Sequence, residues 1–284
     1  MLKSKHIFYA DDCKLYADPV NEKTLIDDDL KTVEKWCPDW FIPINPSKCS
    51  VLHLGHNNPK LLYTINKNII KVIESQKDLG IVITTQLKWT NHVINIVKRA
   101  NSMIYLFRKA FQSLNETTFT KLYKTYIRPL LEFGNVIWSP NLKKDINSLE
   151  KVQRRATKLV GKFKNTSYGE RKRMLKISDL KQRRIRGDLI WTYKILPKMI
   201  STDLSTLFVL NRDTRNRGHS YKLLHQKYNK TCRQNFFVNR VFSSWNALTE
   251  EIVSATSVNI FKNKLDIYLE NRNELSAQAQ KSEQ

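Results

Sequence analysis

The spacing of apolar residues predicts a strand-rich N-terminal part. Apolar side chains alternate on both sides of Asp11-Asp12, with Ile7 and Tyr9 on one face and Phe8 on the other. Alternation with a period of two is typical of strands, and Asp and Asn favour the turns between them. We therefore predict a hairpin over residues 4–18. The same criteria predict a helix over 21–41 ending at Pro38, a strand over 49–54, a hairpin joining 61–65 to 69–73, and a strand over 79–83.

After Trp89 the apolar period changes from two to 3.6, which is the period of an amphipathic helix. Val93, Ile96, Ala100 and Ile104 share one face of the first predicted helix. Residues 197–235 are polar and irregular, and residues 271–284 have no apolar period, so we expect a linker and a disordered tail. The predicted helices cover residues 93–111, 117–131, 143–160, 180–196, 236–253 and 258–269.

These elements predict an α+β protein, with a small β-rich part before a helical majority. The 284 residues are enough for one large domain or two to three small ones, and 7 glycines favour long helices over a many-turn β-sandwich. We expect six segments: 1–90, 91–140, 141–196, 197–235, 236–270 and 271–284.

The positive charge is concentrated in one part of the chain. The formal net charge is +23, and residues 141–240 hold 26 of the 49 basic residues against 7 acidic ones. Such closely spaced positive charges repel one another unless a polyanion offsets them, and nucleic acid is the natural candidate. A solvated basic surface is the plain alternative.

The remaining composition points to an intracellular protein, nuclear or cytoplasmic. The four cysteines are unclustered, as expected of free thiols in a reducing compartment, and no apolar run is long enough to span a bilayer. The first nine residues are too short and polar for a signal peptide. Cys49, His53 and His56 lack a fourth ligand at regular spacing, so we expect no zinc site.

Two adjacent carboxylates, Asp11 and Asp12, lie at the predicted tip of the first hairpin. Carboxylate oxygens are the ligands that hard divalent cations prefer, and a hairpin tip projects them beyond the sheet. Two-metal phosphoryl transfer uses such a site, but it needs a further carboxylate from a neighbouring strand. An Asp-Asp turn on a protein surface is the equally plausible alternative.

A longer series of motifs separates these two interpretations. Phe8-Tyr9-Ala10-Asp11-Asp12 resembles the Y-x-D-D box of reverse transcriptases. Together with the segments downstream, the chain is similar to the C-terminal half of LINE-type, jockey-like non-LTR retrotransposon reverse transcriptases over about residues 5 to 270. Those segments are Trp36 with Trp40, then 44–49, 77–80, 87–89, 92, 123–134, 136–140, 150–158, 183–190, 233–241, 245–248 and 257–262.

The resemblance implies a partial palm, a helical thumb and two-metal nucleotidyl transfer in the intact polymerase, with RNA template, DNA primer and two Mg²⁺ ions. Asp11 matches the metal-binding carboxylate and Asp12 its neighbour, while Tyr9 and Ala10 match the residues beside the primer terminus. Lys48 matches a lysine near the incoming triphosphate. Residues 77–89 resemble the strands that support the primer, and the helices after residue 91 resemble the thumb.

The departures from the family are as informative as the match. Residues 1–10 contain no carboxylate, and the family's other essential aspartate and its fingers precede the hairpin. We therefore expect the chain alone to be incompetent as a polymerase and to need the N-terminal palm and fingers as a partner. The alternative is a non-catalytic basic remnant that binds RNA or DNA. In both cases we expect residues 1–90 to be less stable than the helices, because the hairpin has unpaired edges.

The basic helices are the second candidate site. In the 143–160 helix the cations form a stripe away from its apolar face, and basic clusters follow in the next 30 residues. Such stripes fit phosphate backbones and bind them in a salt-sensitive, sequence-independent way. A solvated face is the alternative, and membrane binding is disfavoured by the polar surroundings. The candidate residues are Lys151, Arg154, Arg155, Lys158, Arg171, Lys172, Arg173, Arg183, Arg184 and Arg186.

Overall fold

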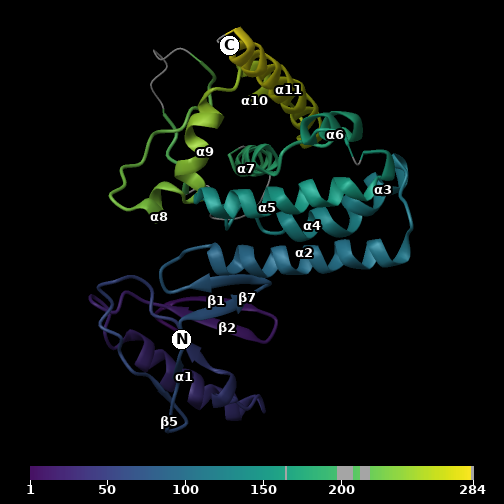
Figure 1. Cartoon of the computed structure of the whole chain (residues 1–284). Coiled ribbons are helices and arrows are strands. Elements are labelled where there is room, and N and C mark those ends of the chain that lie inside the picture. The colour runs from purple at the N-terminus through teal and green to yellow at the C-terminus, as the bar shows by residue number, and fades with distance from the viewer. Residues whose placement is uncertain (164, 197–206, 212–217, 283–284) are drawn as a thin grey trace. The chain divides into compact units, whose positions relative to one another are not determined.

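A computed structural model of the chain describes residues 1–163, 165–196, 207–211 and 218–282 (Figure 1), with side chains up to residue 272. It is a mixed α and β structure, as the hydrophobic pattern predicts. The chain divides into two compact units, residues 1–92 (unit 1) and 93–284 (unit 2), and each is described separately.

Unit 1 is built from two-stranded sheets around one helix. Three of the pairs are antiparallel hairpins joined by two-residue turns, and the fourth pairs β3 with β6 in parallel. Both hairpins predicted from the sequence are present, and the strand predicted over 79–83 forms the second arm of a third one. The elements are β1 (Lys5–Tyr9), β2 (Asp12–Tyr16), α1 (Leu25–Asp39), η1 (Pro46–Lys48), β3 (Ser50–Val51), β4 (Thr64–Ile65), β5 (Asn68–Ile69), β6 (Lys71–Val72), β7 (Ser75–Asp78) and β8 (Ile81–Thr84).

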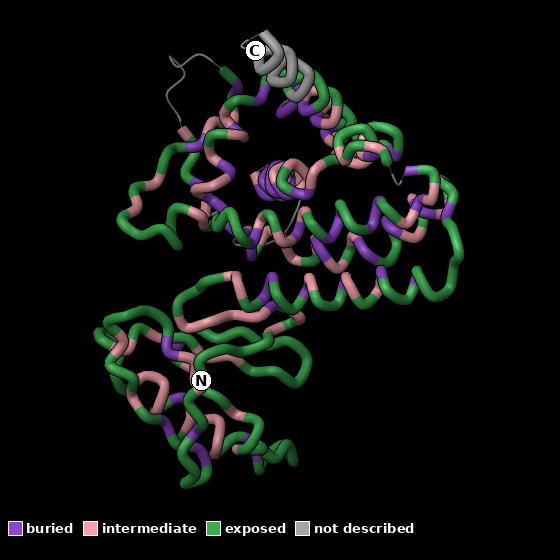
Figure 2. The backbone as a smooth tube through the Cα atoms, viewed as in Figure 1, coloured by how far each residue is buried: buried purple, intermediate pink, exposed green. Residues whose placement is uncertain are grey.

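The apolar core of unit 1 is small. Tyr63, Ile65 and Ile70 form its centre, and in the whole unit only Cys37 and Ile81 join them as buried apolar side chains. In contrast, both faces of the β1–β2 hairpin and the end of α1 remain largely exposed (Figure 2). Burial of apolar area is the main stabilising term in folding, so we expect unit 1 to be less stable than unit 2.

The described elements of unit 2 are helical, and the first of them begins at Thr90, three residues before the boundary of the unit, where the period of the sequence changes. The helix predicted over 117–131 is present but contains a π-helical turn, η2, between α3 and α4. The helices of unit 2 among the described residues are α2 (Thr90–Ala110), α3 (Glu116–Leu122), η2 (Tyr123–Ile127), α4 (Arg128–Glu132), α5 (Lys143–Ala156), η3 (Thr157–Leu159), η4 (Gly161–Phe163), α6 (Tyr168–Leu175), α7 (Leu180–Ile195), α8 (Thr231–Gln234), α9 (Phe237–Asn246), α10 (Glu250–Val253) and α11 (Val258–Ser282).

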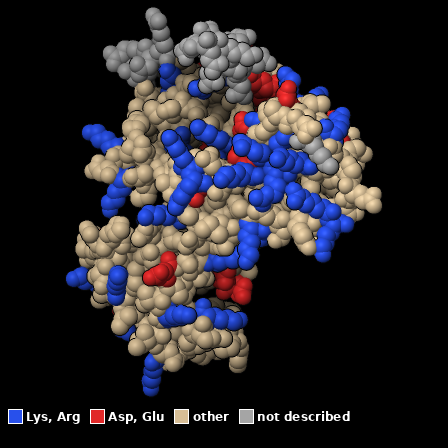
Figure 3. All heavy atoms as spheres, viewed as in Figure 1, with Lys and Arg blue, Asp and Glu red and all other residues tan. Residues whose placement is uncertain are grey.

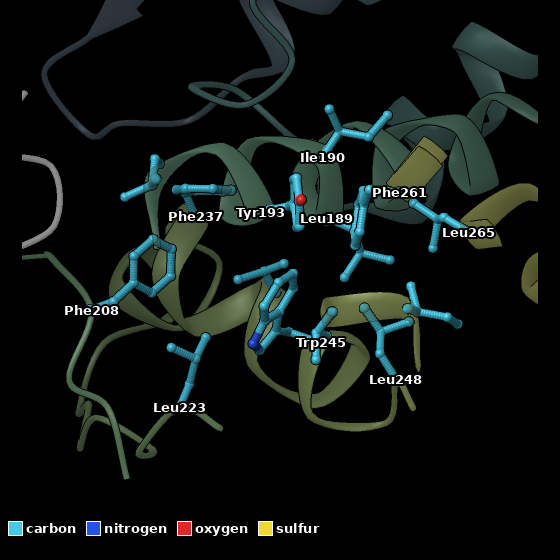
Figure 4. Packing of buried hydrophobic residues seen from close by; sticks show 14 of the residues in the cluster. Leu189, Ile190, Tyr193, Phe208, Leu223, Phe237, Trp245, Leu248, Phe261 and Leu265 are labelled. Carbon is cyan, nitrogen blue, oxygen red and sulfur yellow. The ribbon is translucent and has the colours of Figure 1, made fainter. Parts of the chain in front are cut away.

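The main core of unit 2 lies between α7, α9 and α11 (Figure 4). The rings of Tyr193 and Phe261 stack with their centroids 4.1 Å apart, and Trp245 packs beside Phe261 at 6.2 Å. The Trp245 indole N–H is also satisfied, because it donates to the carbonyl of Tyr221 at 2.8 Å. Apolar packing and a satisfied polar atom together fix α9 in one orientation.

A buried ion pair connects α7 to α9. The guanidinium of Arg240 donates from Nε and Nη2 to the carboxylate of Asp188, both at 2.8 Å, and Nη2 also donates to the carbonyl of Val136 at 2.7 Å. Burial raises the pKa of Asp188 even though Arg240 acts in the opposite direction. A buried charge needs such a partner, so this pair specifies how α7 and α9 pack.

Part of the segment expected to be a linker contributes to this core. Phe208 and Leu223 are buried, and the Asn246 side chain exchanges two hydrogen bonds with the backbone of Leu223, at 2.9 and 3.0 Å. The predicted linker also covers 197–206 and 212–217, which lie outside the described residues.

The last helix, α11, continues to Ser282 and thus beyond residue 270, where we expected the helices to end. The Glu, Ala, Gln and Lys residues there favour helix by propensity. Among the described residues, no helix is both long and apolar enough to cross a membrane.

Candidate catalytic hairpin and basic surface

The Tyr-Ala-Asp-Asp sequence lies at the tip of the β1–β2 hairpin. Tyr9 pairs with Asp12, so the two turn residues are Ala10 and Asp11, and Asp12 is the first residue of β2. Ala10 has φ of +52°, which is uncommon for a residue with a side chain and is the conformation that tight hairpin turns require. All four residues are exposed, and the two carboxylates therefore face solvent at the end of the hairpin.

Two polar contacts that the sequence pattern did not indicate hold this hairpin in unit 1. The buried carboxylate of Asp29 on α1 accepts the backbone N–H groups of Lys3 at 2.9 Å and Ser4 at 2.7 Å. Burial acts to raise the pKa of Asp29, but these hydrogen bonds outweigh it and the net pKa is lowered. On the other strand, Lys14 forms an ion pair with Asp78 of β7 at 2.5 Å. The hairpin is thereby connected both to α1 and to the β7–β8 hairpin.

The tip of the hairpin carries two adjacent carboxylates, those of Asp11 and Asp12. Mg²⁺ is usually held by one or two carboxylates together with waters and substrate phosphates. In the part of the chain that the structure describes, no group of three or more His, Cys, Asp or Glu side chains is placed to hold a metal ion. A two-ion arrangement on this hairpin therefore needs a carboxylate from outside these residues.

Lys48 lies on a separate element. It ends η1, which Asn45 caps by accepting the N–H of Ser47 at 3.0 Å, and its side chain is exposed. Among the described residues, no hydrogen bond or ion pair connects Lys48 to the hairpin carboxylates. The structure thus places Lys48 in unit 1, without bringing it into contact with Asp11 or Asp12.

The basic candidates separate into an exposed and an internal group. Figure 3 shows Lys and Arg gathered over the helices α4 to α7. In the exposed group, Arg154 lies over the ring of Tyr168 at 4.9 Å, and Arg155 donates to the Asn101 side chain of α2 at 2.6 Å. We call the exposed members the basic surface: Lys151, Arg154, Arg155, Lys158 and Arg173.

The internal group makes contacts within the protein. Arg171 is buried and donates to the hydroxyl of Thr157 at 2.8 Å, and Arg184 is buried between helices. Arg183 and Arg186 form two-bond ion pairs with Glu132 and Asp266, and Lys172 pairs with Asp179. Helical spacing alone had placed all five on the phosphate-binding stripe; we leave them out of the basic surface because the structure gives their cationic groups internal positions or partners.

A buried polar network explains why the basic face of α5 points outwards. Gln153, on the opposite face, accepts the hydroxyl of Tyr123 and donates to the Tyr168 hydroxyl at 3.0 Å and to the Ser178 carbonyl at 3.1 Å. Glu150 accepts the Tyr168 hydroxyl and the N–H of Leu180. Burial raises the pKa of Glu150 and of both tyrosines. This network fixes the rotation of α5 about its axis.

Comparison with known proteins connects the sequence to mobile elements. The chain is 21% identical over 196 residues to the RNA-directed DNA polymerase from mobile element jockey of Drosophila melanogaster, which covers 66% of this chain and 21% of that protein. It is 30% identical over 97 residues to the uncharacterized protein B0403.1 of Caenorhabditis elegans, covering 33% of this chain and 49% of that protein. The chain thus spans between a fifth and a half of the length of these curated relatives.

No protein-family model and no solved structure matches the sequence. The similarity to the jockey polymerase is distant, but it extends over two-thirds of the chain and therefore does not rest on a single short motif. It supports a relationship between this chain and retrotransposon reverse transcriptases.

Proposed function

We propose that this chain is part of an RNA-directed DNA polymerase of a non-LTR retrotransposon. Unit 1 would supply the catalytic hairpin and the primer-supporting strands of the palm, and unit 2 the thumb-like helices and a basic region that contacts nucleic acid. The similarity to the jockey polymerase carries this proposal. The Tyr-Ala-Asp-Asp turn, placed at the tip of a hairpin, supports it independently.

In this proposal each candidate site residue of unit 1 has a defined role. Asp11 and Asp12 would hold Mg²⁺ at the hairpin tip, and the bound ion would activate the attacking hydroxyl and offset charge on the phosphates. The hairpin positions these carboxylates, with Tyr9 and Ala10 beside the primer terminus. Lys48 would attract the triphosphate of the incoming nucleotide. The Lys14–Asp78 ion pair would keep the primer-supporting strands in register with the hairpin.

The 284-residue chain alone should not polymerise DNA. We expect no extension of oligo(dT) on poly(rA) with dTTP and Mg²⁺, because two carboxylates are too few for a two-ion site. Primer extension by the chain is measured beside its Asp11→Asn variant, which lacks one of these carboxylates. Extension by the chain that disappears in Asp11→Asn would show that no further carboxylate is needed, and would demonstrate the polymerase activity directly.

A non-catalytic nucleic-acid-binding role is the second candidate, and the exposed cations of α5 favour it. It requires only the basic surface of unit 2 and not the hairpin. Phosphate contacts release counterions, so the logarithm of the binding constant should fall with the logarithm of salt concentration by about 0.9 per contact on a duplex.

The basic surface should therefore control how binding depends on salt. Changing Lys151, Arg154 and Lys158 together to Gln should reduce the salt slope for an RNA–DNA hybrid by roughly 2 to 3, because three phosphate contacts are lost. Fluorescence anisotropy across a salt series measures this slope. The matched control changes the exposed Lys23, Lys31 and Lys35 of unit 1 to Gln, which removes the same charge elsewhere. Equal slopes for the two triple variants would contradict the assignment.

A further inference from the structure

The positive charges of Arg183 and Arg186 on α7 act on Arg128 of α4. Arg183 donates two hydrogen bonds to Glu132, and Arg186 donates two to Asp266 of α11. Arg128, the first residue of α4, lies one helical turn before Glu132 and so on the same face of α4. The carboxylate of Glu132, which acts on the charge of Arg128, is already bound by Arg183 through two hydrogen bonds.

Arg128 is the cation in excess at this place. Its side chain is half-buried, and among the described residues it has no hydrogen bond or ion pair. Burial lowers the pKa of Arg128, the positive charges of Arg183 and Arg186 lower it further, and Glu132 opposes them. Guanidinium nevertheless stays protonated in proteins, so the site retains an uncompensated positive charge. An anion is the natural complement to this charge.

The guanidinium group of Arg128 is suited to binding a phosphate group. Guanidinium presents a planar set of N–H donors that matches two oxygens of a phosphate, and such charge-assisted pairs are among the strongest hydrogen bonds in proteins. Lys124, exposed one turn earlier on the same helical segment, offers a contact for a neighbouring phosphate. Two cations in sequence along one segment fit a phosphodiester backbone better than an isolated small anion.

The backbone before Arg128 is unusual as well. The N–H of Arg128 donates to the carbonyl of Tyr123, five residues earlier, because η2 is a π-helical turn. Pro129 follows and has no N–H to donate, which removes the next helical hydrogen bond. The extra residue in η2 changes the direction in which Arg128 projects, and π-helical turns occur frequently at functional sites.

We propose that Arg128, whose neighbouring carboxylate Glu132 is already bound by Arg183, is a phosphate-binding residue, and that it takes a phosphodiester group of the bound nucleic acid. This site lies on η2 and α4, whereas the residues of the basic surface lie on α5, η3 and α6. It rests on the proposed binding of nucleic acid, and it extends that contact to a residue whose role helical charge patterns did not indicate.

Three variants test the assignment in the full chain. Arg128→Gln should weaken binding of a 12-nucleotide RNA–DNA hybrid about tenfold near 0.1 M salt and reduce the salt slope by about 0.9. Arg128→Lys should recover the slope but only part of the affinity, because an ammonium group cannot pair with two oxygens at once. Lys227→Gln, at an exposed position in unit 2, is the control for charge and should change neither property.

Thermal unfolding separates binding from folding in this test. Arg128→Gln removes a repulsive charge, so its midpoint should be unchanged or raised. Unchanged affinity and slope for Arg128→Gln, with binding by the unsubstituted chain intact, would overturn the role of Arg128 and leave the proposed function in place. A lowered midpoint together with equal losses in Arg128→Gln and Arg128→Lys would show a structural role instead. Absence of binding by the unsubstituted chain would overturn both proposals.

Discussion

Trp245→Ala should lower the free energy of unfolding of unit 2 by about 4 kcal/mol, the usual cost of removing a buried aromatic side chain. The side chain is 1% exposed, packs against Phe261 and His219, and donates to the Tyr221 carbonyl. The substitution leaves a cavity at the junction of α9 and α11 and an acceptor without its donor (Figure 4). Urea unfolding followed by circular dichroism at 222 nm measures the loss in the helix-dominated transition.

The control for this experiment is another tryptophan of the same unit. Trp191 is on α7 but is 38% exposed, with Lys194 over its ring at 5.1 Å. Trp191→Ala should cost less than about 1 kcal/mol, as substitutions at partly exposed positions usually do. Similar losses for Trp191→Ala and Trp245→Ala would mean that the core of unit 2 is not centred on Trp245.

Limited proteolysis should cut unit 1 long before unit 2. Unit 1 buries few apolar side chains, while unit 2 encloses a continuous core. Cleavage follows local opening, and a region with a small core opens at a much lower free energy. With increasing trypsin, we expect a fragment beginning near residue 93 to persist at protease concentrations at least about tenfold above those that remove unit 1, as mass spectrometry can show.

Sequence composition offers an internal control for this experiment, because both units contain many Lys and Arg residues that trypsin can cut. Repeating the digestion with chymotrypsin tests whether the order depends on the protease. A surviving fragment of residues 1–90 after unit 2 has been degraded would contradict the expected order of stability.

The site was only partly predictable from the sequence. The hairpin and its Asp-Asp tip could be predicted because alternation, turn residues and strand pairing all lie within a few residues. The contacts that hold it were not, because Asp29 and Asp78 reach Ser4 and Lys14 across 25 and 64 positions of the chain. No periodic pattern encodes such a pairing.

The basic helices show the same division. In α5, apolar and charged positions separate cleanly, so its exposed cations could be predicted from helical spacing alone. In α7, charge clustering predicted a phosphate-binding stripe of Arg183, Arg184 and Arg186, but neighbours pack on several sides of this helix, so Arg184 is buried and the other two pair with carboxylates. Arg128 was missed for a different reason, because it is separated from Lys124 by three uncharged residues and gives no clustered charge pattern.

The amino-acid sequence by itself determined the local elements of this protein: the hairpins, the change to helices after residue 89, the outward face of α5 and the excess positive charge. These follow from interactions between residues a few positions apart. Only the tertiary structure decided which cations are free to meet a polyanion. Arg183 and Arg186 pair with carboxylates 51 and 80 residues away, whereas the side chain of Arg128 has no hydrogen bond or ion pair among the described residues. Charge is a property of the residue, but its neutralisation depends on which helices pack together.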